Sequence, residues 1–309
     1  MPNLERYSLK GIVLQGELVT YPQLLDSFAK TADGKNLANI TRFVERWKPA
    51  TVNGQPYPNK EWQKLIGIDA NDLYHHLTSA VLTRSFLEAA RNPLPNWPGQ
   101  IGSQVNQFTH DEERLLMLTA TLHDWPEIKT GDIAQETKLT TGAKDDDRAL
   151  MAIVAENFPE LQYTELKAMI PMVIDVLQGT NPKLRAAFTA IENVGYVRTA
   201  LVAWKKTEVY KDFLALELTN ALRAYVTADF ALDLPRLVDS ATLYPGVHQF
   251  LNQRGAQITR IFAAINSERF TQPANEADQI PAAFEYRQKI HNRFASAKEK
   301  WQQFSNLAI

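Results

Sequence analysis

The chain of 309 residues contains no cysteine. This absence excludes disulfide-stabilised small proteins, thiolate zinc sites and cysteine nucleophiles, so a strong metal site would have to use histidine, aspartate or glutamate. The sequence also lacks any run of about 18 apolar residues, and its first residues carry charges where a signal peptide needs an apolar stretch. We therefore expect a cytoplasmic protein with no membrane partner.

An excess of charge of one sign is missing as well. The 33 basic and 35 acidic residues leave a formal net charge of −2. Without a large positive field, neither a nucleic-acid duplex nor an anionic membrane is an expected partner. A small charged ligand stays compatible with this balance.

Patterns typical of β-strands are the last notable absence, because no stretch alternates with period two for long enough. Apolar residues instead recur at intervals of three and four, which is the period of an amphipathic helix. Thr109 and Glu112 have the spacing of a capping box at the start of one such helix, and TNP separates two others. The sequence predicts an all-α protein, with helices at 37–47, 72–90, about 110–124, 148–157, 164–178, 182–206, 208–228, 245–266 and 279–306.

These segments suggest three parts: an N-terminal arm over residues 1–36, a helical core over 37–206 and a C-terminal helical extension over 207–309. The extension carries Phe250, Leu251, Ile258, Ile261, Phe262 and Ile265 at helical spacing. The simplest interpretation is an apolar face that packs on the core. The alternative is an interface between copies of the chain, so a homo-oligomer is possible.

The motif with the clearest chemistry is HDWPE, which contains His123, Asp124 and Glu127. Residues three and four apart share a helix face, so Glu127 would lie beside the adjacent histidine and aspartate. Imidazole and carboxylate ligands suit a divalent ion of manganese, cobalt, magnesium, zinc or iron, whose bound water can become a nucleophile near neutral pH. Glu127 could accept that proton, and Asp132 on the following loop could orient the water or the leaving group.

A second histidine-bearing segment, LYHHLTSAVLTRSF, begins another predicted helix. Either His75 or His76 can reach a shared site. Taken singly, a His-Asp pair, two histidines at a helix start and scattered acids are more often ordinary structural or solvated residues. Their joint order favours a metal site.

Three segments resemble the HD-domain superfamily of metal-dependent phosphohydrolases, in the order that this family has them. LTATLHDWPEIKTGDIAQETK is similar to the core motif of the branch that contains bacterial 5′-deoxynucleotidases, in which HDxxE is followed by TGD. NITRFVERW resembles the first helix of that branch, and HHLTSAVLTRSF resembles its histidine-bearing helix. The resemblance covers about residues 37–206.

The resemblance implies an HD-type helical bundle with a divalent metal. Its ligands would be His75, His123, Asp124 and Glu192, where His75 is favoured over His76 because Leu77 and Ala80 then align. AIENVGYVRTALVAW falls where the family places its last ligand, an aspartate, and this chain has glutamate at that position.

The resemblance further implies a phosphohydrolase whose substrate is a nucleotide, with a deoxynucleoside monophosphate the leading candidate. Glu127 and Asp132 would position or activate water. Arg46, followed by Trp47, would bind the substrate through its phosphate. Two other functions stay open: a di-iron oxidase or oxygenase on the same helices, and a non-catalytic HD fold that binds a nucleotide or a protein.

Overall fold

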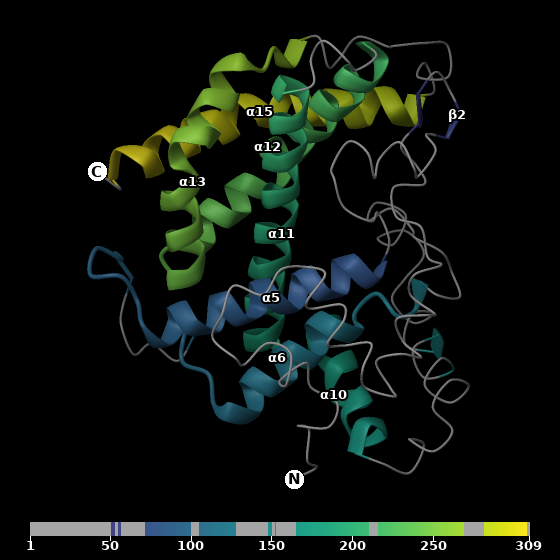
Figure 1. Ribbon diagram of the computed structural model, residues 1–309, viewed down its shortest axis with the longest axis vertical. Coiled ribbons are helices and arrows are strands. Elements are labelled where there is room, and N and C mark those ends of the chain that lie inside the picture. The colour runs from purple at the N-terminus through teal and green to yellow at the C-terminus, as the bar shows by residue number, and fades with distance from the viewer. Residues whose placement is uncertain are drawn as a thin grey trace. The chain divides into compact units, whose positions relative to one another are not determined.

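The computed structural model describes residues 51–52, 55–56, 72–99, 105–127, 148–149, 152, 165–209, 216–268 and 281–307 (Figure 1). Within these ranges the chain is helical apart from turns and one short antiparallel pair. In that pair β1 (Thr51–Val52) runs beside β2 (Gln55–Pro56). The predicted all-α class is confirmed. The predicted arm, the 37–47 helix and most of the 148–157 helix lie outside the described residues, and the predicted three-part division stays a prediction.

The helices have the following bounds: α5 (Asp72–Arg91), α6 (His110–Leu122), α10 (Glu165–Gln178), α11 (Pro182–Val209), α12 (Leu216–Ser240), α13 (Pro245–Ala264) and α15 (Pro281–Leu307). Six of them begin close to the predicted positions. The helix predicted at 208–228 was wrong, because α11 continues to Val209 and α12 ends only at Ser240.

Helix α12 is longer than the sequence pattern suggested, although it contains a proline. Pro235 lies inside this helix, where a missing N–H and a steric clash cost about 3 kcal/mol. The neighbouring side chains of Phe230, Leu234 and Leu237 are fully buried. Each such burial stabilises the fold by roughly 1.5–3 kcal/mol, so together they outweigh the cost of the proline.

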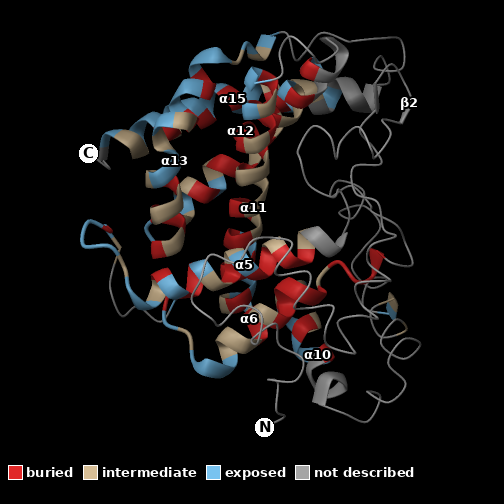
Figure 2. Cartoon of the chain, in the orientation of Figure 1, coloured by how far each residue is buried: buried red, intermediate tan, exposed pale blue. Residues whose placement is uncertain are grey.

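The described elements fall into two compact units. The first contains α5 up to Leu87, α6, α10 and α11 up to Thr189. Here α10 packs against α6, and buried residues colour part of each element of this unit in Figure 2. Leu115, Leu116 and Leu122 of α6 are each at most 4% exposed. The apolar helix predicted before the His-Asp pair is therefore a core element.

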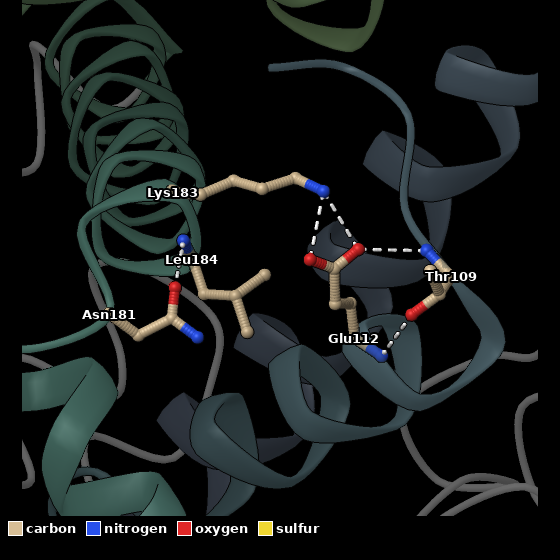
Figure 3. A network of polar contacts seen from close by, with 5 residues as sticks. All are labelled: Thr109, Glu112, Asn181, Lys183 and Leu184. Carbon is tan, nitrogen blue, oxygen red and sulfur yellow. Dashed lines mark hydrogen bonds and ion pairs between the residues drawn. The ribbon is translucent and has the colours of Figure 1, made fainter. Parts of the chain in front are cut away.

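A polar network fixes the start of α6 (Figure 3). The Thr109 hydroxyl accepts a hydrogen bond from the Glu112 N–H at 3.2 Å, and the Glu112 carboxylate accepts one from the Thr109 N–H at 2.8 Å. The predicted capping box is confirmed. Both oxygens of the same carboxylate also lie 2.8 Å from the Lys183 ammonium at the start of α11. Burial tends to raise the pKa of Glu112, but Lys183 and the Thr109 N–H outweigh it, so this pKa is below its usual value.

The break at TNP is a pair of helix caps. Gly179 follows the last residue of α10 with φ of 84°, a backbone conformation that glycine adopts without strain. Two residues later the Asn181 side-chain oxygen accepts a hydrogen bond from the Leu184 N–H at 3.2 Å (Figure 3). Pro182 then occupies the first position of α11, where no N–H is needed. The predicted separation of these helices is confirmed.

The second unit contains the strand pair, the rest of α5 and α11, and helices α12, α13 and α15. Its core includes an aromatic ladder, in which the ring of Phe262 on α13 lies 5.0 Å from Phe230 of α12 and 5.3 Å from Phe294 of α15. Leu251, Ile258, Ile261 and Phe262 of the predicted apolar face are buried. Within this unit, α12 and α15 help to cover that face.

Carboxylates are unexpected in such a core, yet α12 buries two of them one turn apart. Asp229 is 8% exposed and Asp233 is 7% exposed. Burial and the neighbouring Asp233 raise the pKa of Asp229 well above its usual value, despite a hydrogen bond from Tyr225. Burial raises the pKa of Asp233 to about 6, although Arg236 lies 3.2 Å away and opposes the shift.

Replacing Asp233 by asparagine is expected to stabilise the protein at pH 7 by up to about 3 kcal/mol. The raised pKa means that the folded state binds more protons than the unfolded state between pH of about 4 and about 6, so wild-type stability falls as the pH rises through this window. The full shift corresponds to about 3 kcal/mol, and it already includes the opposing effect of the half-exposed Arg236.

Urea unfolding at pH 4 and pH 7 measures this effect. The advantage of the variant should shrink toward pH 4, because the wild-type carboxyl is then protonated in the folded state and about half protonated in the unfolded state. The exposed Asp175 on α10 supplies a matched aspartate-to-asparagine control. Equal stability of variant and wild type at both pH values would contradict the expected cost of the buried charge.

Candidate metal centre

The candidate centre begins where α6 ends. His123 is the C-cap of this helix, and its N–H still bonds the Thr119 carbonyl at 3.0 Å. The chain then tightens, because the N–H groups of Trp125 and Glu127 bond carbonyls three residues back at 3.0 and 2.9 Å. Pro126 has no N–H to continue an α-helical ladder. The prediction that one regular helical turn carries the motif is corrected to a tight turn after the helix.

Three polar side-chain atoms from two helix ends converge in the first unit. The Nε2 atom of His75, in the first turn of α5, lies 3.0 Å from Nε2 of His123. The Oδ2 atom of Asp124 lies 3.3 Å from each of these two nitrogens. The His123 and Asp124 side chains are 6% and 9% exposed, whereas that of His75 is 19% exposed. The atoms form a nearly equilateral triangle with an opening to solvent on the His75 side.

The protonation of His123 follows from its other nitrogen. Nδ1 lies 3.1 Å from the Ala120 carbonyl oxygen, which only accepts hydrogen bonds, so Nδ1 carries the proton. In the neutral ring Nε2 then presents a lone pair toward the triangle. A proton on His75 Nε2 would link His75 to its neighbours, but it would leave His123 Nε2 and Asp124 Oδ2 as two acceptors facing one another. A cation satisfies all three atoms.

The size of the triangle fits a divalent metal. With metal–ligand bonds of about 2.0–2.2 Å, neighbouring ligand atoms in tetrahedral or octahedral sites lie roughly 2.9–3.5 Å apart. The edges of 3.0, 3.3 and 3.3 Å fall in that range. The Ala120 carbonyl supplies the backbone partner that usually orients a metal-ligating imidazole.

Helix α11 supplies a further carboxylate. The Phe188 ring contacts the His123 ring, with centroids 5.2 Å apart, and Glu192 follows one helical turn later. One ligand atom from each of His75, His123 and Glu192 lies within 4.8 Å of the others, so this group could hold a metal ion. This group contains three of the four side chains named as ligands from the sequence, and the set of four stays a prediction.

The remaining predicted residues divide in two. Glu127 is 3% exposed, so its carboxylate is buried. In the sequence it lies only three residues after Asp124. Asp132, Arg46 and Trp47 lie outside the described residues.

The choice between the two histidines is clearer in the structure than in the sequence. His75 directs Nε2 into the triangle, whereas His76 is 2% exposed and its ring centroid lies 5.8 Å from that of His123. The three imidazoles thus form one cluster in which His75 makes the short contacts with His123 and Asp124.

Sequence analysis missed the supporting residues. Phe188 packs on His123, the Ala120 carbonyl accepts a hydrogen bond from His123 Nδ1, and Tyr196 donates to Glu192 at 3.5 Å. For the two aromatic residues the only signal in the sequence is helical spacing, since Phe188 and Tyr196 each lie four residues from Glu192. An aromatic residue at that spacing is far more often a core residue, so the signal is weak without the structure.

No family model matches the chain, and neither the curated proteins nor the solved structures include a significantly similar one. Among the described helices, none combines the length and apolar character needed to cross a membrane. The candidate site therefore has to be judged by its own geometry and by the motif resemblance.

Proposed function

We propose that this protein is a metal-dependent phosphohydrolase that cleaves a small phosphate ester, with a deoxynucleoside monophosphate as the leading candidate substrate. The observation that carries the proposal is the triangle of His75 Nε2, His123 Nε2 and Asp124 Oδ2, whose edges suit one divalent ion. The order of the motifs around it, which resembles that of HD-domain phosphohydrolases, supports the reaction class.

The roles of the residues follow from their chemistry. His75, His123, Asp124 and Glu192 would hold the metal, and the bound ion would activate water and neutralise charge on the phosphate. Two neutral imidazoles and two carboxylates leave coordination positions for water and substrate on a metal that prefers five or six ligands.

Two further groups complete the proposed chemistry. Glu127 is buried, so its carboxylate can accept a proton from the attacking water in a site of low dielectric constant. Phe188 covers one side of the His123 ring and keeps water from competing for it. Arg46 is proposed to bind the phosphate, because a guanidinium matches its oxygens bidentately.

A di-iron oxidase is the second candidate, because His76 adds a third imidazole, which is buried, to the cluster. Its ring centroid lies 6.3 Å from that of His75 and 5.8 Å from that of His123. A second iron would need ligands beyond those of the triangle. This candidate predicts iron in the isolated protein and consumption of oxygen.

Phosphate release from nucleoside mono-, di- and triphosphates tests the proposal. The full chain is stripped with a chelator and then supplied with manganese, cobalt or magnesium. Release that requires added metal and favours monophosphates is the expected result. Absence of release with every metal and every substrate contradicts the proposal, and iron analysis with oxygen uptake then tests the oxidase.

A further inference from the structure

Glu192 has an unusual neighbour on its own helix. The hydroxyl of Tyr196, one turn later on α11, donates to Oε2 of Glu192 across 3.5 Å. Both side chains are partly buried. The separation is at the long end for a hydrogen bond between oxygens, so the bond is weak, but its direction assigns one carboxylate oxygen of Glu192 to the tyrosine.

Helix α12 also brings a residue close to Tyr196. The chain between α11 and α12 spans only residues 210–215, and Arg223 lies over the Trp204 ring at 5.3 Å near that connection. Farther from it, Tyr225 is close enough to Tyr196 for the two hydroxyl groups to interact electrostatically. These two pairs show that residues of α12 lie close to α11 at two points.

The second tyrosine, Tyr225, forms a hydrogen bond with a different carboxylate. Tyr225 hydrogen-bonds Asp229 one turn later on α12, and burial together with Asp229 raises the pKa of Tyr225 well above its usual value. Each tyrosine hydroxyl therefore forms a hydrogen bond with a carboxylate on its own helix. Tyr225 stays a donor to Asp229, which leaves Tyr196 as the donor to Glu192.

We propose that Tyr196 is a positioning residue that holds one oxygen of Glu192 so that the other can bind the metal. A glutamate has one more rotatable bond than an aspartate, and immobilising such a side chain costs free energy. Hydrogen bonds from outer groups orient metal-ligating carboxylates and commonly change metal affinity by a factor of about 10–100. This inference rests on the proposed metal centre and adds a residue to it.

Metal affinity of the full chain with Tyr196→Phe tests the inference. Titration calorimetry with Mn²⁺ is expected to show a dissociation constant raised by a factor of about three to thirty. This factor is lower than the usual effect of such a hydrogen bond, because the bond from Tyr196 to Glu192 is long. The melting temperature of the chelated variant should match that of the wild type. Tyr244→Phe, which removes a buried hydroxyl just before α13, is the matched control and should leave affinity unchanged.

A double-mutant cycle separates positioning from a general structural effect. In the Glu192→Asp background the shorter carboxylate loses the reach to Tyr196, so the additional Tyr196→Phe change should have no effect on affinity. Equal affinities of wild type and Tyr196→Phe, or the same loss in both backgrounds, would overturn the inference. A wild type that binds no Mn²⁺ would instead overturn the metal centre itself.

Discussion

Replacing Asp124 by asparagine is expected to lower metal-dependent phosphate release by about a thousandfold or more. The carboxylate oxygen completes the triangle with His75 and His123, each 3.3 Å away. An amide supplies a neutral and poorer ligand, and stabilisation of transition-state charge by a metal amounts to several kcal/mol. Each 1.36 kcal/mol corresponds to a factor of ten in rate. Initial rates with saturating Mn²⁺ and metal content after dialysis measure the effect.

The same substitution should not destabilise the metal-free protein. The new amide can donate a hydrogen bond to the lone pair of His123 Nε2, which replaces two facing acceptors by a favourable pair worth about 1 kcal/mol. Asp111→Asn changes an exposed aspartate in the first turn of the same helix and is the matched control. A variant that keeps wild-type phosphate release, or that loses it only through unfolding, would count against a catalytic metal at this position.

Replacing Trp301 by alanine is expected to lower the free energy of unfolding by about 3–5 kcal/mol, the usual loss for a large buried aromatic side chain. Trp301 of α15 is 2% exposed. Its indole N–H donates to the Thr259 hydroxyl of α13 at 2.9 Å, and its ring lies 5.5 Å from that of Phe304. The substitution leaves a cavity where α13 and α15 meet and removes the indole donor to Thr259.

Urea unfolding followed by far-ultraviolet circular dichroism measures this loss. Trp301→Phe should cost less, because it keeps most of the packing and loses only the indole donor. Gln302→Ala, at the next and exposed position of α15, should change stability by less than about 0.5 kcal/mol. A loss below about 1 kcal/mol for Trp301→Ala would mean that this helix contact contributes little to the folded state.

Local signals predicted the helices well. The Thr109 and Glu112 capping box, the break before Pro182 and the apolar period of α13 depend on residues within a few positions of one another. Interactions of that range are encoded in the order of the residues. The end of α12 was missed, because the helix continues past 228 and through Pro235 between buried residues on both sides.

The identity of the candidate ligands was also predicted from sequence, by the motif order rather than by spacing alone. The expectation that His123, Asp124 and Glu127 share a regular helical turn was wrong, since α6 ends at Leu122. The convergence of His75 with His123 joins residues 48 positions apart. Spacing within one helix holds no information about such a contact.

By itself, then, the sequence determined the helical class, the caps and the types of side chain available to a metal, because each depends on composition or short-range order. Only the tertiary structure decided that His75 rather than His76 makes the 3.0 Å contact with His123. It alone decided that Asp124 lies 3.3 Å from the His75 nitrogen and that Phe188 of α11 contacts the His123 ring. The physical reason is that ring orientations and distances of a few tenths of an ångström are set by how helices pack, and packing depends on contacts between residues far apart in the chain.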